Sequence, residues 1–182
     1  MARVRPKFFS PRIDPRADAL SYQYPTIHGS YVMAESSTEI TALNTLTATL
    51  IDSVTGYRDA ADHAESSQFM EMFRKFADER SQCVETLRQQ VSSLGGEAES
   101  DGSFLGKTHQ RFLDLKAAIT GRDDKAIINE VERGEDYLKE KFETVLKDAE
   151  LSPASRSAVE QAYQSVRHGH DQMSDLKHGM EA

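Results

Sequence analysis

Residues 129–145, NEVERGEDYLKEKFETV, decide how the fold of this sequence is interpreted. Apolar residues recur at helical spacing, so the stretch is predicted to be one continuous helix. A projection at about 100° per residue places on one line Val131, Glu135, Leu138 and Phe142. Glu135 therefore points inward, directly after Gly134, which weakens a helix interior by about 1 kcal/mol relative to alanine. A carboxylate turned inward beside a glycine predicts a polar site inside the fold.

Similar apolar stripes occur along most of the chain after residue 33. They predict four long helices, at about 37–64, 66–94, 124–149 and 152–178. Each has a start signal, namely a capping box at Ser36-x-x-Glu39, Ser66, Asp123, and Ser152 followed by Pro153. No alternating β pattern is present, so the fold is predicted to be all-α.

The connection between the second and third long helices is much longer than the other two. It follows Gly95-Gly96 and contains a predicted short helix from Ser103 to about Thr120. One long crossover is typical of a ferritin-like four-helix bundle rather than a simple up-down-up-down bundle. We therefore expect a ferritin-like bundle over residues 33–182.

The first 32 residues differ from the rest of the chain. They hold four of the five prolines and five basic against two acidic side chains, and they lack a helical period. This segment is predicted to be an extended or disordered arm. One interpretation is that Met33 is the natural start; the other is that the arm packs on a partner subunit.

Composition limits the classes of partner and compartment. Residues 33–182 carry 17 basic and 28 acidic groups, a net charge of −11, which disfavours nucleic acid as a partner. No apolar run approaches the roughly 18 residues of a membrane span, and Cys83 is the only cysteine. We expect a soluble cytoplasmic protein that does not bind membranes.

The same projection brings side chains from the other three helices to the level of Glu135. The fourth helix turns His170 inward, next to Gly169, and the second places Arg80 near the centre of its stripe with Glu79 beside it. The first helix contributes Tyr57. These residues are predicted to form one polar layer in an otherwise apolar bundle.

One interpretation of the layer is a metal centre. Di-iron bundles use a Glu from each of two helices and a Glu-x-x-His from each of the other two. The candidate ligands for iron or manganese are Glu79, Glu132, Glu135 and His170. The pattern is incomplete, because Gln82 stands where the second helix would supply a histidine and Arg167 precedes His170 by three residues.

The alternative is a structural network in which Arg80 binds Glu135, completed by His170 and the Tyr57 hydroxyl. Buried pairs of this kind contribute little net stability but can fix helix register. The positive charge of Arg80 also disfavours a metal cation in the same layer.

Several short motifs resemble one known family. They are the double glycine before "GS", the "DLK" of Asp114 to Lys116, the "ERGED" of Glu132 to Asp136, and His170-Asp171. The chain is similar over residues 38–178 to uncharacterised bacterial ferritin-like four-helix-bundle proteins, a domain of unknown function. The resemblance implies a ferritin-like bundle in the cytoplasm and no particular activity.

Two functions follow as hypotheses. The first is a non-enzymatic bundle that forms homo-oligomers and is associated with stress, with no cofactor. The second is a metal-binding protein that holds iron or manganese in an incomplete carboxylate and histidine site. The sequence does not decide whether the protein is an enzyme.

Overall fold

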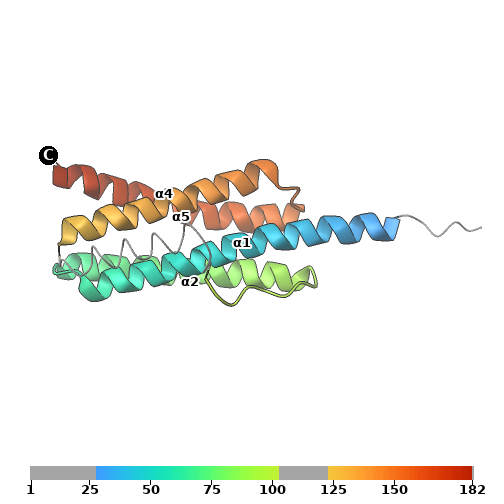
Figure 1. The fold of residues 1–182 in the computed structure, drawn as a ribbon, viewed down its shortest axis with the longest axis horizontal. Helices are drawn as coiled ribbons and strands as arrows, with labels where there is room; N and C mark the ends of the chain where they lie inside the picture. Colours follow the sequence, from blue (N-terminus) through green and yellow to red (C-terminus); the bar gives the residue numbers. More distant parts are fainter. Residues whose placement is uncertain (1–27, 103–122, 182) are drawn as a thin grey trace, which may run out of the picture.

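The computed structural model describes residues 28–102 and 123–181, with the side chains of 28–36, 148 and 181 left aside. This part of the chain forms four helices that pack side by side along their length (Figure 1). They are α1 (His28–His63), α2 (Ser67–Ser93), α4 (Asp124–Asp148) and α5 (Pro153–Glu181). No strand occurs among the described residues, so the predicted all-α class is confirmed there.

The end of α2 and the start of α4 match the sequence signals. Leu94 ends α2 and Gly95 follows with a φ of 76°, a left-handed conformation that favours glycine. The N–H of Gly96 donates to the carbonyl of Val91 at 3.0 Å, which closes the last turn. At the start of α4, the Asp123 side chain accepts a hydrogen bond from the N–H of Lys125.

The start of α1 is not where the capping box predicted it. The helix begins at His28, nine residues before the predicted residue 37, so Ser36 and Glu39 lie inside it. The Glu39 carboxylate instead accepts a hydrogen bond from the N–H of Ser152 at 2.9 Å and is 7% exposed. The Glu39 carboxylate therefore caps the start of α5 rather than the start of α1, because the packing of the two helices places it beside the N–H of Ser152. Residues 1–27 of the predicted arm lie outside the described residues.

One end of the bundle gathers the end of α1 and the starts of α2 and α4. The Asp124 carboxylate accepts hydrogen bonds from the backbone N–H groups of Glu65 at 2.8 Å and Ser66 at 3.1 Å. Lys125 donates to the carbonyl of Met180 at 3.0 Å, so α5 ends there as well. Helices α2 and α4 are therefore parallel, and α1 and α5 run in the opposite direction (Figure 1).

The opposite end holds the α4–α5 turn and the residues that follow α2. Here the Asn44 side chain donates to the carbonyl of Glu97 at 2.8 Å and accepts from the N–H of Glu99 at 2.9 Å. A Cβ added to Gly102 would contact Asp52, eight residues farther along α1. The segment after α2 therefore runs back along α1. The predicted short helix at 103–120 lies outside the described residues.

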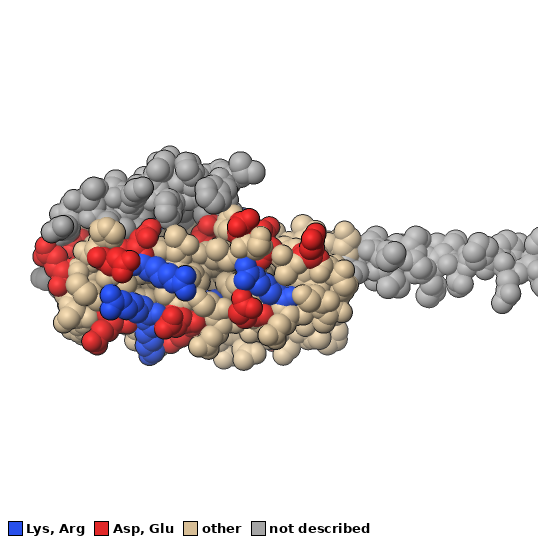
Figure 2. All heavy atoms as spheres, turned by 90° about the horizontal axis from the view of Figure 1, so that it is seen from below, with Lys and Arg blue, Asp and Glu red and all other residues tan. Residues whose placement is uncertain are grey.

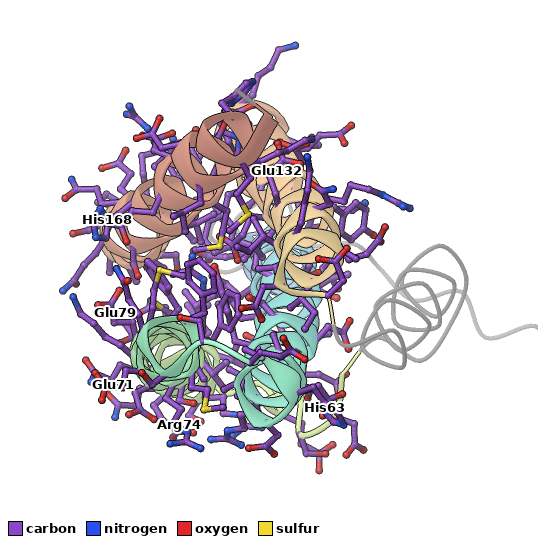
Figure 3. All side chains as sticks on the ribbon, turned by 90° about the vertical axis from the view of Figure 1, so that its left-hand side faces the viewer. His63, Glu71, Arg74, Glu79, Glu132 and His168 are labelled. Carbon is purple, nitrogen blue, oxygen red and sulfur yellow. The ribbon has the colours of Figure 1, made fainter. Side chains whose placement is uncertain are left out.

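Each helix packs against two neighbours, in the cyclic order α1, α2, α5, α4, as the end-on view shows (Figure 3). Two apolar clusters fill the interior. The first contains Leu43, Leu46, Leu50, Val84, Leu87, Leu138, Phe142, Val159 and Val166, among others. The second, toward the starts of α2 and α4, contains Tyr57, Phe73, Phe76, Ile127, Ile128, Val131 and Met173, among others. The candidate site lies where the two clusters meet.

The outer surface that Figure 2 shows carries acidic and basic side chains next to one another rather than a patch of one sign. Pairs such as Arg74 with Asp62 and Arg88 with Glu85 are of this exposed kind. Within the described part of the chain, none of the helices combines the length and the apolar character needed to cross a membrane.

Candidate functional site

Arg80 is the centre of the polar layer inside the bundle. Its side chain is fully buried, on the core stripe of α2 between Phe76 and Cys83. The guanidinium Nη2 lies 2.6 Å from Oε2 of Glu135, which is only 2% exposed. The structure thus brings together two of the predicted site residues. A charge-assisted hydrogen bond of this length neutralises both groups without solvent.

Two serines complete the network. Arg80 Nη1 donates to the hydroxyl of Ser165 on α5 at 2.8 Å. The Ser53 hydroxyl of α1 donates to Oε1 of Glu135 at 3.1 Å. The ion pair between α2 and α4 is therefore also bonded to α1 and α5, so the layer joins all four helices.

The charges of this pair act on each other. Burial alone, the largest single influence, would lower the pKa of Arg80, but the charge of Glu135, the hydrogen bond to it and the nearby Tyr57 together outweigh burial, and the pKa is raised. A guanidinium is protonated at any physiological pH in any case. Arg80 therefore stays charged, and it can act neither as a general base nor as a metal ligand.

Tyr57 lies at the edge of the layer. Its ring stacks on Phe76 with centroids 5.3 Å apart, and Arg80 Cζ lies 5.9 Å from the ring centroid. Burial, and then the charge of Glu135, raises the pKa of the phenol well above its ordinary value. Within the described part of the chain, the Tyr57 hydroxyl and Arg80 Nε are buried without a well-formed hydrogen bond. The Tyr57 hydroxyl therefore lies beside the ion pair, and its interaction with Glu135 helps to raise its pKa, but the two groups do not reach good hydrogen-bond geometry.

The two glycines that flank the layer have different surroundings. A Cβ added to Gly169 would clash with Arg80 Nη2 and lie 3.0 Å from Oε2 of Glu135. At Gly134 nothing lies within 4 Å of an added Cβ. Gly169 therefore gives Arg80 the space it occupies, whereas Gly134 faces open space and is not a point of close helix approach.

His170 was predicted to point into the layer, but it lies outside it. Its Nε2 lies 3.0 Å from Oδ1 of Asp136 and its Nδ1 lies 2.9 Å from Oδ1 of Asp171, and both of these carboxylates are exposed. Because successive residues of a helix are turned by about 100°, the helix that directs Gly169 toward Arg80 directs His170 away. The helical projection of the sequence therefore placed the wrong residue inward on α5, His170 instead of its neighbour Gly169.

The other predicted ligands also lie apart. Glu79 is 3.8 Å from the ammonium of Lys75, on the outer flank of α2. Glu132 accepts a hydrogen bond from Lys177 at 2.9 Å, and Figure 3 shows Glu79 and Glu132 on different sides of the bundle. The described residues contain no group of three His, Cys, Asp or Glu side chains that could hold a metal. The four candidate ligands, Glu79, Glu132, Glu135 and His170, therefore do not share a site.

Sequence reasoning missed Ser53 and Ser165. A signal was present, since Ser53 precedes Tyr57 by four residues and Ser165 precedes Gly169 by four, the spacing of neighbours on one helix face. Serine is common on helix surfaces, however, so this spacing alone does not single these two out.

The layer therefore has one clear chemical property. It is a network in which a cation and an anion neutralise each other and two serine hydroxyls occupy further hydrogen-bonding positions, while Arg80 Nε and the Tyr57 hydroxyl keep no well-formed partner among the described residues. It presents no unpaired carboxylate, imidazole or thiolate to solvent. The Cys83 thiol lies nearby, and burial raises its pKa, which makes it less reactive.

Comparison with protein families gives one match. Residues 38–148 match the model of a family described as a domain of unknown function, DUF2383. The match covers more than half of the chain, which therefore belongs to this family. A search of curated proteins returns no match.

Proposed function

We propose that this member of the DUF2383 family is a non-enzymatic, ferritin-like bundle that acts through self-association, with a buried polar layer that fixes its helix register. The parallel direction of α2 and α4, both starting at the same end, supports the ferritin-like arrangement, because it requires one long connection between them. The observation that carries the non-enzymatic part is the Arg80–Glu135 pair, 2.6 Å apart and almost fully buried.

The pair argues against a catalytic or metal-binding layer on physical grounds. The guanidinium occupies the cation position next to Glu135, so a metal ion there would have to displace Arg80 from the core. A buried ion pair contributes little net stability against well-packed apolar residues, yet breaking it costs much more. It therefore penalises every helix register that separates Arg80 from Glu135, and this is the role we assign to it.

The projection of α1 supports self-association. The helix begins at His28 and extends beyond the end of the bundle (Figure 1). Residues 28–38 contain a single Asp, Glu, Lys or Arg, namely Glu35, in a chain that is 29% charged. A projecting helical segment with few charges is marginal in water by itself, which favours its burial against another subunit. The association with stress stays a prediction.

Two measurements test this proposal. Protein purified without a histidine tag should contain no stoichiometric iron or manganese, and should take up none from anaerobic Fe(II) or Mn(II). Stoichiometric metal that is lost in the Glu135→Ala, His170→Ala double variant would overturn the structural role of the layer.

Light scattering over a range of concentrations tests self-association. We expect a mass of at least twice that of the 20.4 kDa chain. A chain that begins at Met33 should associate more weakly, because it lacks the first turn of α1. A full-length chain that stays at 20.4 kDa at every concentration would contradict this part of the proposal.

A further inference from the structure

The segment that follows α2, residues 96–102, lies along the surface formed by α1 and α2 (Figure 1). We call this segment the strap. It is neither helix nor strand, and its backbone groups bond to side chains of the two helices. Its position therefore depends on a few contacts that can be named one by one.

The Asn44 amide of α1 binds the backbone on both sides of Ala98. It donates to the carbonyl of Glu97 at 2.8 Å and accepts from the N–H of Glu99 at 2.9 Å. A residue of a neighbouring β-strand makes bonds of the same kind, and a primary amide can imitate it because it carries both a donor and an acceptor. Asn44 therefore recognises an extended backbone rather than a particular side chain.

Arg88 of α2 binds the next part of the same backbone. Its Nε donates to the carbonyl of Glu99 at 2.9 Å, and its Nη2 donates to the carbonyl of Ser100 at 3.1 Å. A planar guanidinium presents its N–H groups in fixed directions, so it can hold two successive carbonyls at once. Asn44 and Arg88 together span residues 97–100 from two different helices.

The side of the strap that faces the helices carries small residues. A Cβ added to Gly96 would lie 2.9 Å from two carbons of Ile40, and one added to Gly102 would clash with the Asp52 carboxylate. Ala98 packs against the first apolar cluster. The helices therefore leave room for a backbone that comes close to them and for a single methyl group.

The other side of the strap is acidic. Glu97 and Asp101 are exposed, and the Glu99 carboxylate accepts hydrogen bonds from the N–H groups of Ser100 at 3.0 Å and Asp101 at 3.1 Å. The strap contains no apolar residue larger than alanine, so little hydrophobic burial opposes its release. Water can replace its hydrogen bonds at this surface, so its release costs less than opening the core does.

Release of the strap would uncover part of α1. Ile40 lies against the backbone of Gly96, and Ile51 lies 3.6 Å from a Cβ added to Gly102. The buried polar layer is enclosed by the four helices themselves. It therefore stays closed when the strap leaves.

We propose that residues 96–102 are a releasable strap, held on α1 and α2 by Asn44 and Arg88, and that it detaches as one unit while the four helices stay packed. Asn44 is the decisive contact, because it binds the backbone on both sides of Ala98. The device lets the fold expose one face of α1 and free the chain after α2 without opening the polar layer.

Native-state amide exchange of the full chain, followed by NMR, tests this proposal. In Asn44→Ala, the Glu99 N–H should exchange about tenfold faster or more, because two hydrogen bonds of the strap are lost. Amides in the middle of α2 and α4 should keep their wild-type rates. Thr45→Ala is the matched control, because Thr45 is an exposed neighbour whose hydroxyl bonds to Thr41 of its own helix. It should leave the exchange of the Glu99 N–H unchanged.

A second pair of variants keeps Asn44 and protects the test against misfolding of Asn44→Ala. Ala98→Gln places a larger side chain against the apolar cluster, whereas Glu97→Gln places the same residue at the exposed neighbouring position. The first should speed exchange of the Glu99 N–H several-fold, and the second should not. Wild-type exchange at Glu99 in both Asn44→Ala and Ala98→Gln, or an equal acceleration throughout the helices, would overturn the proposal.

Discussion

Glu135 and Asp136 are neighbours in the chain but lie in opposite environments. Glu135 is 2% exposed and contacts a guanidinium at 2.6 Å, whereas Asp136 is 57% exposed and contacts an imidazole at 3.0 Å. Each bond links α4 to another helix, to α2 through Arg80 and to α5 through His170. Their distances differ by a few tenths of an ångström, so distance does not separate them.

The two pairs differ in whether water can solvate their groups once the bond is broken. Water can solvate Asp136 and His170 at the surface, so the loss of their contact is small. Arg80 and Glu135 are 0% and 2% exposed, so the loss of either leaves an unpaired charge in the core. The buried Arg80–Glu135 pair and the surface Asp136–His170 pair are therefore expected to respond very differently to mutation.

The largest effect is expected from Arg80→Ala, which isolates Glu135. Removal of one partner of a buried pair costs about 3–5 kcal/mol of unfolding free energy. Urea unfolding at neutral pH measures this loss. The double variant Arg80→Met, Glu135→Leu should recover most or all of it, since neither charge is then left alone. A double variant as unstable as Arg80→Ala would show that Arg80 acts through packing and not through its charge.

The two glycines beside the layer differ in the space that an added methyl group would enter. Gly169→Ala should destabilise the protein by about 1–3 kcal/mol, because the new methyl group overlaps the guanidinium of Arg80. Gly134→Ala should stabilise it by about 0.5–1 kcal/mol, since the methyl meets nothing and alanine favours the helix. Chemical denaturation of both variants provides the measurement. Equal effects at the two sites would mean that Arg80 moves aside freely.

Glu39 tests the same principle at the other end of the bundle and as a function of pH. Burial alone would raise its pKa, but hydrogen bonds from Ser152 and Ser155 outweigh this and lower it. A lowered folded-state pKa means that the carboxylate stabilises the fold above the ordinary value of 4.5, and that this is lost as pH falls. Glu39→Gln should therefore cost about 1–2 kcal/mol at pH 7, from the loss of a charged hydrogen bond. The difference in unfolding free energy between Glu39→Gln and wild type should become smaller as the pH falls below 4.5. Urea unfolding at several pH values measures this difference.

The smallest effect is expected at a partly exposed pair within one helix. Arg133 lies 2.9 Å from Glu130 in α4, and their side chains are 50% and 19% exposed. Glu130→Gln should change the unfolding free energy by no more than about 0.5 kcal/mol, because exposed helix pairs are screened by water and salt. A loss comparable to that of Arg80→Ala would contradict the view that burial separates the two kinds of pair.

Most of the helices could be predicted from local signals. Asp123, Ser152 and Gly95 mark ends that the structure shares, because caps and a left-handed glycine act through bonds to nearby residues. The start of α1 could not be predicted in this way. Its capping box is a valid local pattern, but Glu39 bonds to Ser152, 113 residues away.

The candidate site shows the same division. The inward direction of Arg80 and Glu135 followed from the period of their own helices, since a strong apolar stripe defines which face is buried. The prediction failed on α5, where Gly169 and His170 both lie three or four residues from the buried Val166 and Met173, so helical spacing alone admits either one on the buried face. An error of one residue there turns the side chain by about 100°, which is enough to move an imidazole from the core to the surface.

Local patterns were enough to predict that the protein is helical, where three of its helices begin or end, and that a carboxylate and a guanidinium point inward. These properties depend on hydrogen bonds and periodicity within one helix. The contact of Arg80 with Glu135, the addition of Ser53 and Ser165, and the position of His170 outside the layer between two aspartates became visible only in the packed bundle. Those contacts depend on the rotation of each helix against its neighbours, which is set by the packing of all four stripes together.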